Sequence, residues 1–407
     1  MTWIEAAAAK QPDRIAIEGP ERIVTYTELR EAAAARAGAM RGPRVPLAAP
    51  AVEDFAVDLH ACLVAGAAVV PIDLRLSPAE QAQRRAAADV NVETPDACAD
   101  VPVAVMHTSG TTAAPKPVVL TASNFLASAL GSAVALGLDP AERWLCPMPL
   151  THVGGLSIPI RSAIYATTAV LHGRFDTETV LSDLMDPGRR ITLVSLVPTM
   201  LARLLDAGLA RPPTLRWALL GGGPIASALL ARASEAGVPV APTYGMTEAC
   251  SQIATFGWPL SGVDVRVADD DEVLVRGPIV SARAVSEDGW LHTGDLGRFD
   301  ERGRLEIVGR VSDTIISGGE NVAPAEVEAV LLEHPAVADA AVHPRADPEW
   351  GEAVVATVVV RDGLSVAPDE LRAHCAARLA GFKVPKLVEF AEGLPRTPSG
   401  KLLRRQL

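Results

Sequence analysis

Apolar runs and helical patterns alternate over the first two thirds of this chain. The segment Phe55–Ala65 has helical spacing and leads through Gly66 to the strand-like run Ala68–Ile72. Further along, Ile191–Val197 is an apolar run typical of a buried parallel strand, and Thr199–Ala207 behind it has helical spacing. This alternation predicts parallel sheets covered by helices, with ligands at the carboxyl ends of the strands.

The same pattern continues to about residue 242. Leu215–Leu220 is another apolar strand, and it ends in Gly221-Gly222-Gly223-Pro224. A helical segment, Ile225–Ala236, and a further strand, Val238–Pro242, follow it. Near the start of the chain, the alanine-rich segment Ala32–Met40 is also predicted to be helical.

Two changes of pattern divide the rest of the chain. After Gly257, short alternating segments between Asp and Gly turns predict a small antiparallel β unit, made of Val263–Val267, Glu272–Arg276 and Leu305–Val308. A different pattern begins near Ser312, where Pro324 opens a helix that ends near Glu333. The remaining predicted elements are two strands and a helix, at Ala338–Val342, Val354–Val360 and Pro368–Leu379.

These patterns predict an α/β protein of two domains, since 407 residues exceed what one core normally holds. We expect a large N-terminal domain over residues 1–309, with parallel sheets covered by helices plus the small β unit. A hinge would follow at residues 310–313. A smaller, mobile α+β domain would occupy residues 314–407.

Composition narrows the class of protein. Hydrophobic residues make up 49% of the chain and charged residues 21%, which fits a globular protein with ample apolar side chains for a core. The formal net charge of -12 argues against a nucleic acid as the main partner. Neither a secretory signal nor a stretch of about 18 uncharged apolar residues appears, so a cytoplasmic protein without a membrane span is expected. The five cysteines have no metal-binding spacing, so we expect reduced thiols and no metal site built from cysteines.

The most informative segment follows the apolar stretch Val101–Met106. It runs from His107 to Lys116 and combines hydroxyls, a glycine and one lysine in a short turn. Backbone N–H groups, hydroxyls and an ammonium are the donors with which proteins hold phosphates. The spacing differs from the common G-x-x-x-x-G-K-[ST] loop, and a turn rich in Ser, Thr and Gly is often only a solvated loop. Other segments must therefore support a nucleotide site.

Four further segments carry side chains suited to such a site: 243–248, 290–295, 309–321 and 398–401. In the first, Tyr244 can stack on a base, Thr247 can reach a phosphate and Glu248 can bind a divalent cation. In the second, Asp295 follows a tight glycine turn and suits a ribose diol. Lys401 lies on a polar tail. Each residue also has a plain structural interpretation: a helix cap for Glu248, a core residue for Tyr244, a turn residue for Asp295, a surface charge for Arg310 and a solvated lysine for Lys401.

In this order, the segments resemble the adenylate-forming superfamily of acyl-CoA ligases, nonribosomal-peptide adenylation domains and firefly-type luciferases. The resemblance extends from residues 12–14 and 25–29 to Lys401, nearly the whole chain. It implies ATP, Mg²⁺ and the co-substrate CoA as ligands, and a small-molecule carboxylic acid as substrate. The expected partners include no nucleic acid and no membrane, and a homodimer is left open.

The resemblance also implies roles for individual residues. Those of the ATP phosphate loop are Thr108, Ser109, Gly110, Thr111, Thr112 and Lys116. Those near adenine are Gly222, Gly223, Pro224 and Tyr244, and the ribose hydroxyls would bind Asp295 and Arg310. The acyl substrate would meet His152, Arg161, Gly221, Gly245 and Met246. The catalytic residues would be Lys401, Thr247, Glu248 and His152, with Glu248 also binding Mg²⁺, Ser312 as the hinge, and Gly318 and Gly319 near CoA.

The chain departs from the family pattern in its phosphate loop. Ala113 and Pro117 stand where relatives usually have glycine, which stiffens the loop. This motivates one alternative function, a nucleotide-binding relative with impaired catalysis. The region before the loop is also shorter than is usual in the family.

The acyl substrate is suggested by the segment 149–161, which lacks the Asp that amino-acid-activating relatives use. His152, Arg161 and residues 162–165 instead resemble the o-succinylbenzoate-CoA ligases of menaquinone biosynthesis, a branch of the superfamily. That substrate has two carboxylates, so Arg161 is predicted to hold the aromatic one, directly or through water. The alternatives are that Arg161 pairs with a structural acid, that the enzyme is an aryl (benzoate-type) CoA ligase, or that it loads a carrier protein.

The resemblance implies a mechanism in two steps. A substrate carboxylate attacks the α-phosphorus of ATP, and Lys401 with Mg²⁺ neutralises the two anions. The CoA thiol then attacks the acyl-adenylate. We expect the C-terminal domain to swing about Ser312 between the steps, because Lys401 serves the first and must be clear of the second.

Overall fold

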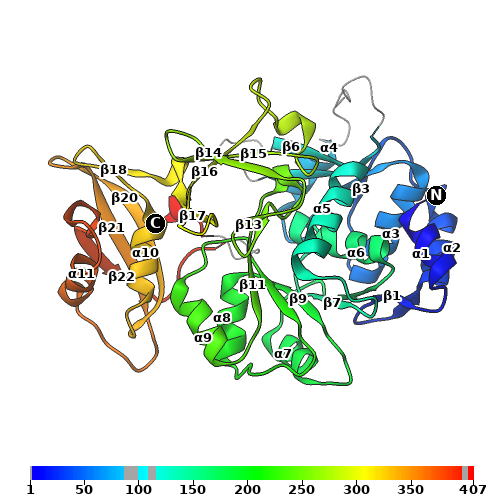
Figure 1. Ribbon diagram of the computed structural model, residues 1–407, viewed down its shortest axis with the longest axis horizontal. Coiled ribbons are helices and arrows are strands. Elements are labelled where there is room, and N and C mark those ends of the chain that lie inside the picture. The colour runs from blue at the N-terminus through cyan, green and yellow to red at the C-terminus, as the bar shows by residue number, and fades with distance from the viewer. Residues whose placement is uncertain (1, 87–99, 109–115, 397–401) are drawn as a thin grey trace.

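The computed structural model of the chain describes residues 2–86, 100–108, 116–396 and 402–407. Its α-helices are α1 (Trp3–Lys10), α2 (Tyr26–Ala37), α3 (Val52–Ala65), α4 (Pro78–Ala86), α5 (Ala122–Leu136), α6 (Val153–Tyr165), α7 (Thr177–Met185), α8 (Pro198–Asp206), α9 (Ser227–Glu235), α10 (Pro324–Leu332) and α11 (Pro368–Ala376). The strands form four sheets, and the part of the chain after residue 314 lies at the end opposite the N-terminus (Figure 1).

A nine-stranded sheet forms the centre of the large N-terminal part. Its strands are, in spatial order, β13 (Trp258–Pro259), β12 (Ala254–Thr255), β11 (Val240–Tyr244), β10 (Trp217–Leu220), β9 (Leu193–Leu196), β7 (Arg143–Cys146), β8 (Thr168–Leu171), β1 (Ile15–Glu18) and β2 (Ile23–Thr25). The strands from β11 to β1 pair in parallel, which confirms the predicted parallel sheet. The antiparallel edge strands β2, β12 and β13 were not predicted.

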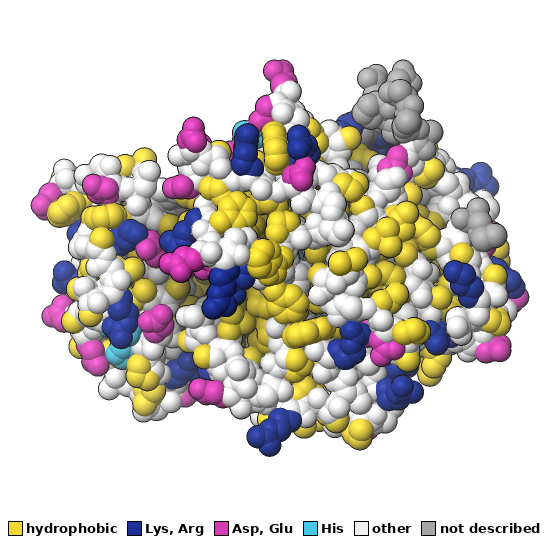
Figure 2. Space-filling model, viewed as in Figure 1, with side chains coloured by type: hydrophobic (Ala, Val, Ile, Leu, Met, Phe, Trp, Pro, Cys, Tyr) yellow, Lys and Arg dark blue, Asp and Glu magenta, His cyan; other side chains and the backbone are white. Residues whose placement is uncertain are grey.

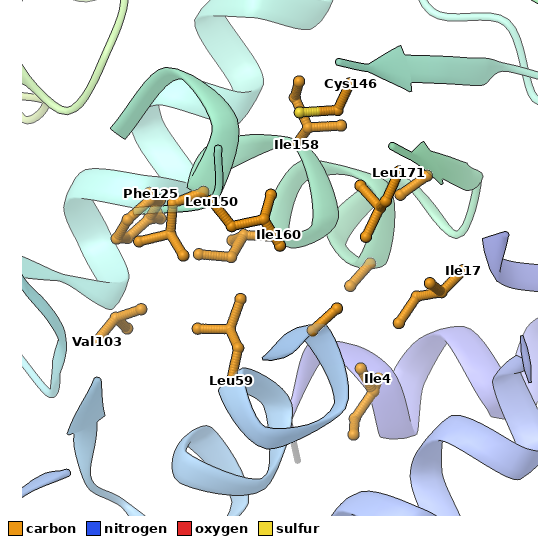
Figure 3. Packing of buried hydrophobic residues seen from close by; sticks show 14 of the residues in the cluster. Ile4, Ile17, Leu59, Val103, Phe125, Cys146, Leu150, Ile158, Ile160 and Leu171 are labelled. Atoms are coloured by element: carbon orange, nitrogen blue, oxygen red, sulfur yellow. The ribbon is translucent and has the colours of Figure 1, made fainter. Parts of the chain in front are cut away.

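Apolar side chains bury both faces of this sheet. Trp144 belongs to the core that packs under α1, α3 and α6, whereas its neighbour Leu145 belongs to the core under α7, α8 and α9. Successive residues of a strand point to opposite faces, so uninterrupted apolar runs are what a sheet between two helix layers requires. Figure 3 shows the first of these cores, to which α3 contributes Leu59, α6 contributes Ile160 and β8 contributes Leu171.

A second sheet holds the strand that precedes the predicted phosphate loop. Its order is β3 (Arg44–Leu47), β4 (Ala68–Pro71), β5 (Pro102–Thr108) and β6 (Lys116–Thr121). The pairs β3–β4 and β4–β5 are parallel and β5–β6 is antiparallel. The strand predicted before the phosphate loop is therefore confirmed as β5.

The predicted antiparallel β unit is confirmed, with one more strand than expected. Its order is β14 (Asp264–Val267), β15 (Glu272–Arg276), β16 (Leu291–Phe299) and β17 (Leu305–Arg310). Asp295 was predicted to follow a tight glycine turn, and this was wrong because residues 291–295 lie in β16. Gly294 has φ +68° inside the strand, a backbone conformation that glycine adopts without a steric penalty.

The C-terminal part has its own sheet and core. The sheet contains β19 (Glu320–Val322), β18 (Ile315–Ser317), β21 (Gly351–Val360) and β20 (Val337–Asp347), and β22 (Leu387–Phe390) pairs with β21 in parallel. Helices α10 and α11 supply Val327, Leu331, Leu371 and Cys375 to its core. The α+β character predicted for this smaller unit is thus confirmed, while β18, β19 and β22 were not predicted.

Local signals explain why some helices begin where they do. The predicted helix Ala32–Met40 begins earlier, at Tyr26, because Thr25 and Glu28 form a capping box. Helix α10 begins at Pro324, as predicted, with proline in the first turn. Across the described ranges, no helix is long and apolar enough to cross a membrane. On the face shown in Figure 2, basic and acidic side chains are interspersed and hydrophobic ones gather near the middle.

Candidate active site

Three predicted ribose- and base-binding residues meet at one point of the structure. Asp295 of β16 lies opposite Arg310 of β17 in the strand register, and Arg310 Nε donates a hydrogen bond to Asp295 Oδ1. The hydroxyl of Tyr244, at the end of β11, donates to Asp295 Oδ2 at 2.8 Å. We call these three residues the Asp295 cluster. It joins the parallel sheet to the antiparallel β unit.

Burial and the mutual contacts of the Asp295 cluster shift the pKa values of its two donors, Tyr244 and Arg310. Asp295 is 5% exposed. Burial, and then the charge of Asp295, raise the pKa of Tyr244, which keeps its hydroxyl protonated. Burial opposes the charge of Arg310, but the hydrogen bond and charge of Asp295 outweigh it and raise the pKa of Arg310. Asp295 is therefore no turn residue and Arg310 no free surface charge.

Two glycines allow the backbone segments beside this cluster to approach each other. Leu220 of β10 pairs with Pro242 of β11, so the residues after both strands lie at one edge of the sheet. A Cβ on Gly221 would lie 2.7 Å from Thr243 Cγ2, and one on Gly245 would lie 1.6 Å from the backbone oxygen of Ser251. Side chains are excluded at both positions. The edge also holds the other predicted residues of these segments, Gly222, Gly223, Pro224 and Met246.

Thr247 and Glu248 follow directly in a single 3-10 turn, Thr247–Ala249. The backbone oxygen of Glu248 accepts from Ser281 N at 2.8 Å, which fixes the turn. Its half-buried carboxylate has no hydrogen bond or ion pair among the residues the structure describes. No long helix follows for Glu248 to cap. A carboxylate without a protein partner fits a ligand of Mg²⁺, which usually binds one or two carboxylates together with phosphate oxygens.

The structure describes the phosphate loop only at its two ends. Thr108 ends β5, and the register pairs it with Lys116, the exposed first residue of β6. The predicted residues Ser109, Gly110, Thr111 and Thr112 lie outside the described residues, as do Ala113 and the proposed catalytic Lys401. Their roles remain predictions.

A charged cluster beside His152 was missed by the sequence analysis. Asp73 follows β4, and Arg75 Nε donates to its Oδ1 at 2.8 Å. Thr151 Oγ1 donates to Asp73 Oδ2 at 3.5 Å. His152 is the N-cap residue of α6. The signal that could have found this cluster is the run Asp73-Leu74-Arg75 directly after a buried parallel strand, where ligand-binding side chains gather.

The two histidines near this cluster are held in the neutral form. The surrounding protein lowers the pKa of His152, although the residue is exposed, and Asp73 only partly opposes the effect. Burial, helped by Arg84, lowers the pKa of His107 to about 4. Neutral imidazoles can accept as well as donate hydrogen bonds at neutral pH.

Arg161 of α6 is buried among neutral partners. It is 1% exposed, its Nη2 donates to Ser128 Oγ at 2.8 Å, and its guanidinium lies 5.7 Å from the ring centroid of Trp144. Within the described ranges no carboxylate pairs with it, so nothing there supports the alternative that it pairs with a structural acid. Its Nε has no hydrogen-bond partner among the residues that the structure describes. Burial lowers the pKa of Arg161, because a charged guanidinium is less stable away from water.

The predicted hinge and CoA residues lie beyond β17. Ser312 is exposed in the 3-10 turn Val311–Asp313 that links β17 to β18. Gly318 and Gly319 both have positive φ in the turn between β18 and β19. The N–H of Gly318 donates to the backbone oxygen of Trp350 at 2.8 Å, and a Cβ there would lie 3.0 Å from the Trp350 ring.

Family models match most of this chain, and known relatives match its whole length. The model described as "AMP-binding enzyme" matches residues 4–94 and 79–283, and "AMP-binding enzyme C-terminal domain" matches residues 326–401. The chain is 36% identical to 2-succinylbenzoate–CoA ligase of Bacillus licheniformis, covering 100% of this chain and 98% of the relative. It is 38% identical to the protein of the same name from Bacillus cereus, covering 100% and 97%.

Solved structures agree with this similarity. The o-succinylbenzoate CoA synthetase of Bacillus subtilis in complex with its acyl-adenylate intermediate has a TM-score of 0.86 and 34% identity, covering 100% of this chain and 97% of that one. The same protein in complex with ATP and magnesium ion has a TM-score of 0.86 and 34% identity, covering 100% and 99%.

Proposed function

This chain belongs to the AMP-binding enzyme family, and from that premise we propose that it is an ATP-dependent ligase that joins 2-succinylbenzoate to CoA through an acyl-adenylate. The observation that carries this proposal is the similarity, over the whole chain, to relatives named 2-succinylbenzoate–CoA ligase. The proposed setting is menaquinone biosynthesis in the cytoplasm. We propose the domains 1–309 and 314–407 with a hinge at 310–313, and a homodimer as the assembly to test by sedimentation.

The first step forms the acyl-adenylate. A carboxylate oxygen of the substrate attacks the α-phosphorus of ATP, a P–O bond forms, and pyrophosphate leaves. The Asp295 cluster is proposed to hold the ribose, because the Asp295 carboxylate can accept hydrogen bonds from two hydroxyls. Glu248 would hold Mg²⁺, which supplies positive charge against the phosphates when bound. Lys401 is proposed to bring an ammonium to the two anions as they join.

The second step transfers the acyl group to sulfur. The CoA thiol loses its proton and attacks the acyl carbonyl, a C–S bond forms, and AMP leaves with the bonding electrons of the mixed anhydride. The exposed Ser312 and the short turn around it support a pivot here. The Gly318–Gly319 turn, with its positive φ angles, is proposed to approach the thiol path after the pivot.

The acyl pocket is proposed at the carboxyl edge of the nine-stranded sheet. Gly221 and Gly245 lie at this edge, and His152 follows β7, which ends at the same edge. Arg161 is proposed as the charge partner of the second carboxylate. The guanidinium of Arg161 is buried, and among the described residues its Nε has no partner and no carboxylate pairs with it. Its positive charge therefore lacks a counter-charge there, and the second carboxylate of a dicarboxylic substrate can supply one.

The test is pyrophosphate release from ATP and Mg²⁺ with a panel of acids, followed by thioester formation with CoA. We expect activity with 2-succinylbenzoate well above that with benzoate or other aryl monocarboxylates. Preference for a benzoate would establish the aryl-CoA ligase instead. ATP binding without acid-dependent pyrophosphate release would establish an impaired relative, and acyl transfer to a carrier protein but not to CoA would establish a loading module.

A further inference from the structure

The last described residues of the chain pack against the C-terminal sheet through paired contacts. Arg396 and Leu402, which flank residues 397–401, form an antiparallel β-bridge. The N–H of Leu403 donates to the backbone oxygen of Pro395 at 2.9 Å. The sequence places Lys401 directly before Leu402, so the described residues on either side of 397–401 are held to each other.

Arg404, three positions after Lys401, makes the most extensive of these contacts. Its Nη1 and Nη2 donate to the two carboxylate oxygens of Glu328 on α10, the second at 2.9 Å. Nη1 also donates to the backbone oxygen of Val342 at 3.1 Å, and Nε donates to Asp313 Oδ2 at 3.4 Å. We call Arg404, Glu328 and Asp313 the Arg404 cluster. It connects the tail to the helix α10 and to the proposed hinge.

Burial and geometry distinguish this cluster from an ordinary surface ion pair. Glu328 is 6% exposed, and its Oε1 also accepts from Val342 N at 2.7 Å. A planar guanidinium that meets both oxygens of a buried carboxylate fixes direction as well as distance, which a lysine ammonium cannot do. On the other side of 397–401, Arg396 Nη2 donates to both oxygens of Asp339, at 2.9 and 2.7 Å.

We propose that Arg404 is a positioning residue for the adenylation step: through Glu328 and Asp313 it fixes the tail, and thereby Lys401, relative to the hinge. This inference rests on the proposed function, since it requires that Lys401 acts in adenylation. Arg404 itself touches neither ATP nor acid. Misplacing a catalytic group by about 1 Å can cost on the order of 100-fold in rate, so a loosened tail has a measurable effect.

The experiment measures the two half-reactions separately in the full-length enzyme. Adenylation is followed by acid-dependent pyrophosphate release, and thioester formation is followed from supplied acyl-adenylate and CoA. Arg404→Ala is expected to lower kcat of adenylation roughly 10- to 100-fold, with KM for ATP and acid nearly unchanged and thioester formation retained. Arg404→Lys keeps the positive charge but cannot contact both carboxylate oxygens of Glu328 at once, so it is also expected to lower kcat of adenylation. Wild-type adenylation in a folded Arg404→Lys enzyme would overturn the proposal, whatever the stability of Arg404→Ala.

A second arm separates positioning from general stability. In a Lys401→Ala background, Arg404→Ala is expected to cause no further loss of adenylation, because the group that it positions is already absent. An additive loss there, or an equal loss in both half-reactions, would show a merely structural role. If Lys401→Ala alone leaves adenylation undiminished, the proposed role of the lysine fails, and the inference about Arg404 fails with it.

The matched control is Arg345→Ala. Arg345 donates to both oxygens of Glu389, at 2.9 and 2.8 Å, so it is also a forked pair in the C-terminal sheet, but an exposed one. Among the described residues, Arg345 forms no hydrogen bond or ion pair with the tail or the hinge. We expect both half-reactions of Arg345→Ala to match the wild type.

Discussion

The hydroxyl of Tyr244 donates a hydrogen bond of 2.8 Å to Asp295, and this contact joins two sheets whose strands come from distant parts of the chain. Tyr244 ends β11 of the parallel sheet, and Asp295 lies in β16 of the antiparallel unit. Arg310 donates to the other carboxylate oxygen. The proposed nucleotide site would therefore lie between two sheets, and its geometry would depend on both.

Asp295→Asn is expected to raise KM for ATP roughly 10- to 100-fold. The change removes the charge that pairs with Arg310, and hydrogen bonds to charged groups contribute about 1.5–3 kcal/mol each. Steady-state kinetics with varied ATP would measure it. An unchanged KM for ATP in a folded Asp295→Asn enzyme would remove Asp295 from the nucleotide site.

Tyr244→Phe is expected to have a smaller effect on the same parameter. It removes one hydroxyl and keeps the ring, and a single hydrogen bond contributes about 1 kcal/mol net, or about fivefold. The check is the same ATP titration. A loss as large as that of Asp295→Asn would mean that the hydroxyl orients the whole cluster.

Gly245→Ala is expected to destabilise the protein by about 1–3 kcal/mol and to lower adenylation, because the added Cβ would meet the backbone oxygen of Ser251. Gly38→Ala is a matched control, since a Cβ there meets nothing within 4 Å and the backbone is helical. Urea unfolding of both variants measures the difference. Equal stability of the two variants would contradict the close approach at Gly245.

Stability is expected to fall at acidic pH through His60. Both ring nitrogens of this fully buried side chain lack hydrogen-bond partners in the part of the chain that is described. Burial lowers its pKa to about 4. The unfolded chain binds a proton below the ordinary pKa of about 6.5, whereas the folded chain resists it, so stability is lost as pH falls from about 6.5 towards 4.

The loss attributable to His60 is on the order of 3 kcal/mol across that interval. Urea unfolding at several pH values would measure it, with His60→Leu as the comparison. The variant is expected to lose less stability on acidification than the wild type. Parallel pH profiles for the two proteins would assign the acid sensitivity to other groups.

Arg161→Met is expected to separate stability from substrate binding. Removing a buried guanidinium that has no carboxylate partner among the described residues is expected to preserve or raise Tm. The same change is expected to raise KM for 2-succinylbenzoate but not for a monocarboxylate. A lower Tm with equal losses for all acids would show that the contacts of Arg161 to Ser128 and Trp144 are purely structural.

The sequence predicted the elements whose patterns depend on local burial. The apolar runs at 191–197 and 215–220 became β9 and β10 because strands buried on both faces contain little else. Strand β16 was missed because its polar residues and Gly294 have the composition of a turn, and only pairing with β15 and β17 makes it a strand. The very short β12 and β13 carry no periodic signal of their own.

In the candidate site, too, the sequence indicated individual residues but not the contacts between distant ones. Tyr244, Asp295 and Arg310 were identified through a resemblance of motifs, while their contact with one another is a property of the folded chain. Asp73 and Arg75 escaped notice because their neighbour His152 is 79 and 77 positions away in the sequence. Likewise, the sequence gives no sign that Arg404 reaches Glu328 on α10.

Arg310 and Asp313 are separated by only two residues, yet one bonds to Asp295 and the other to Arg404. The hydroxyl of Thr314 also donates back to the Arg310 carbonyl at 3.0 Å, which tightens the stretch between them. So short a segment, held at both ends, allows Arg310 and Asp313 little movement relative to each other. If the C-terminal sheet rotates about this stretch as proposed, the rotation would strain one of the two acidic contacts, and ribose binding at Asp295 would then depend on the position of the tail.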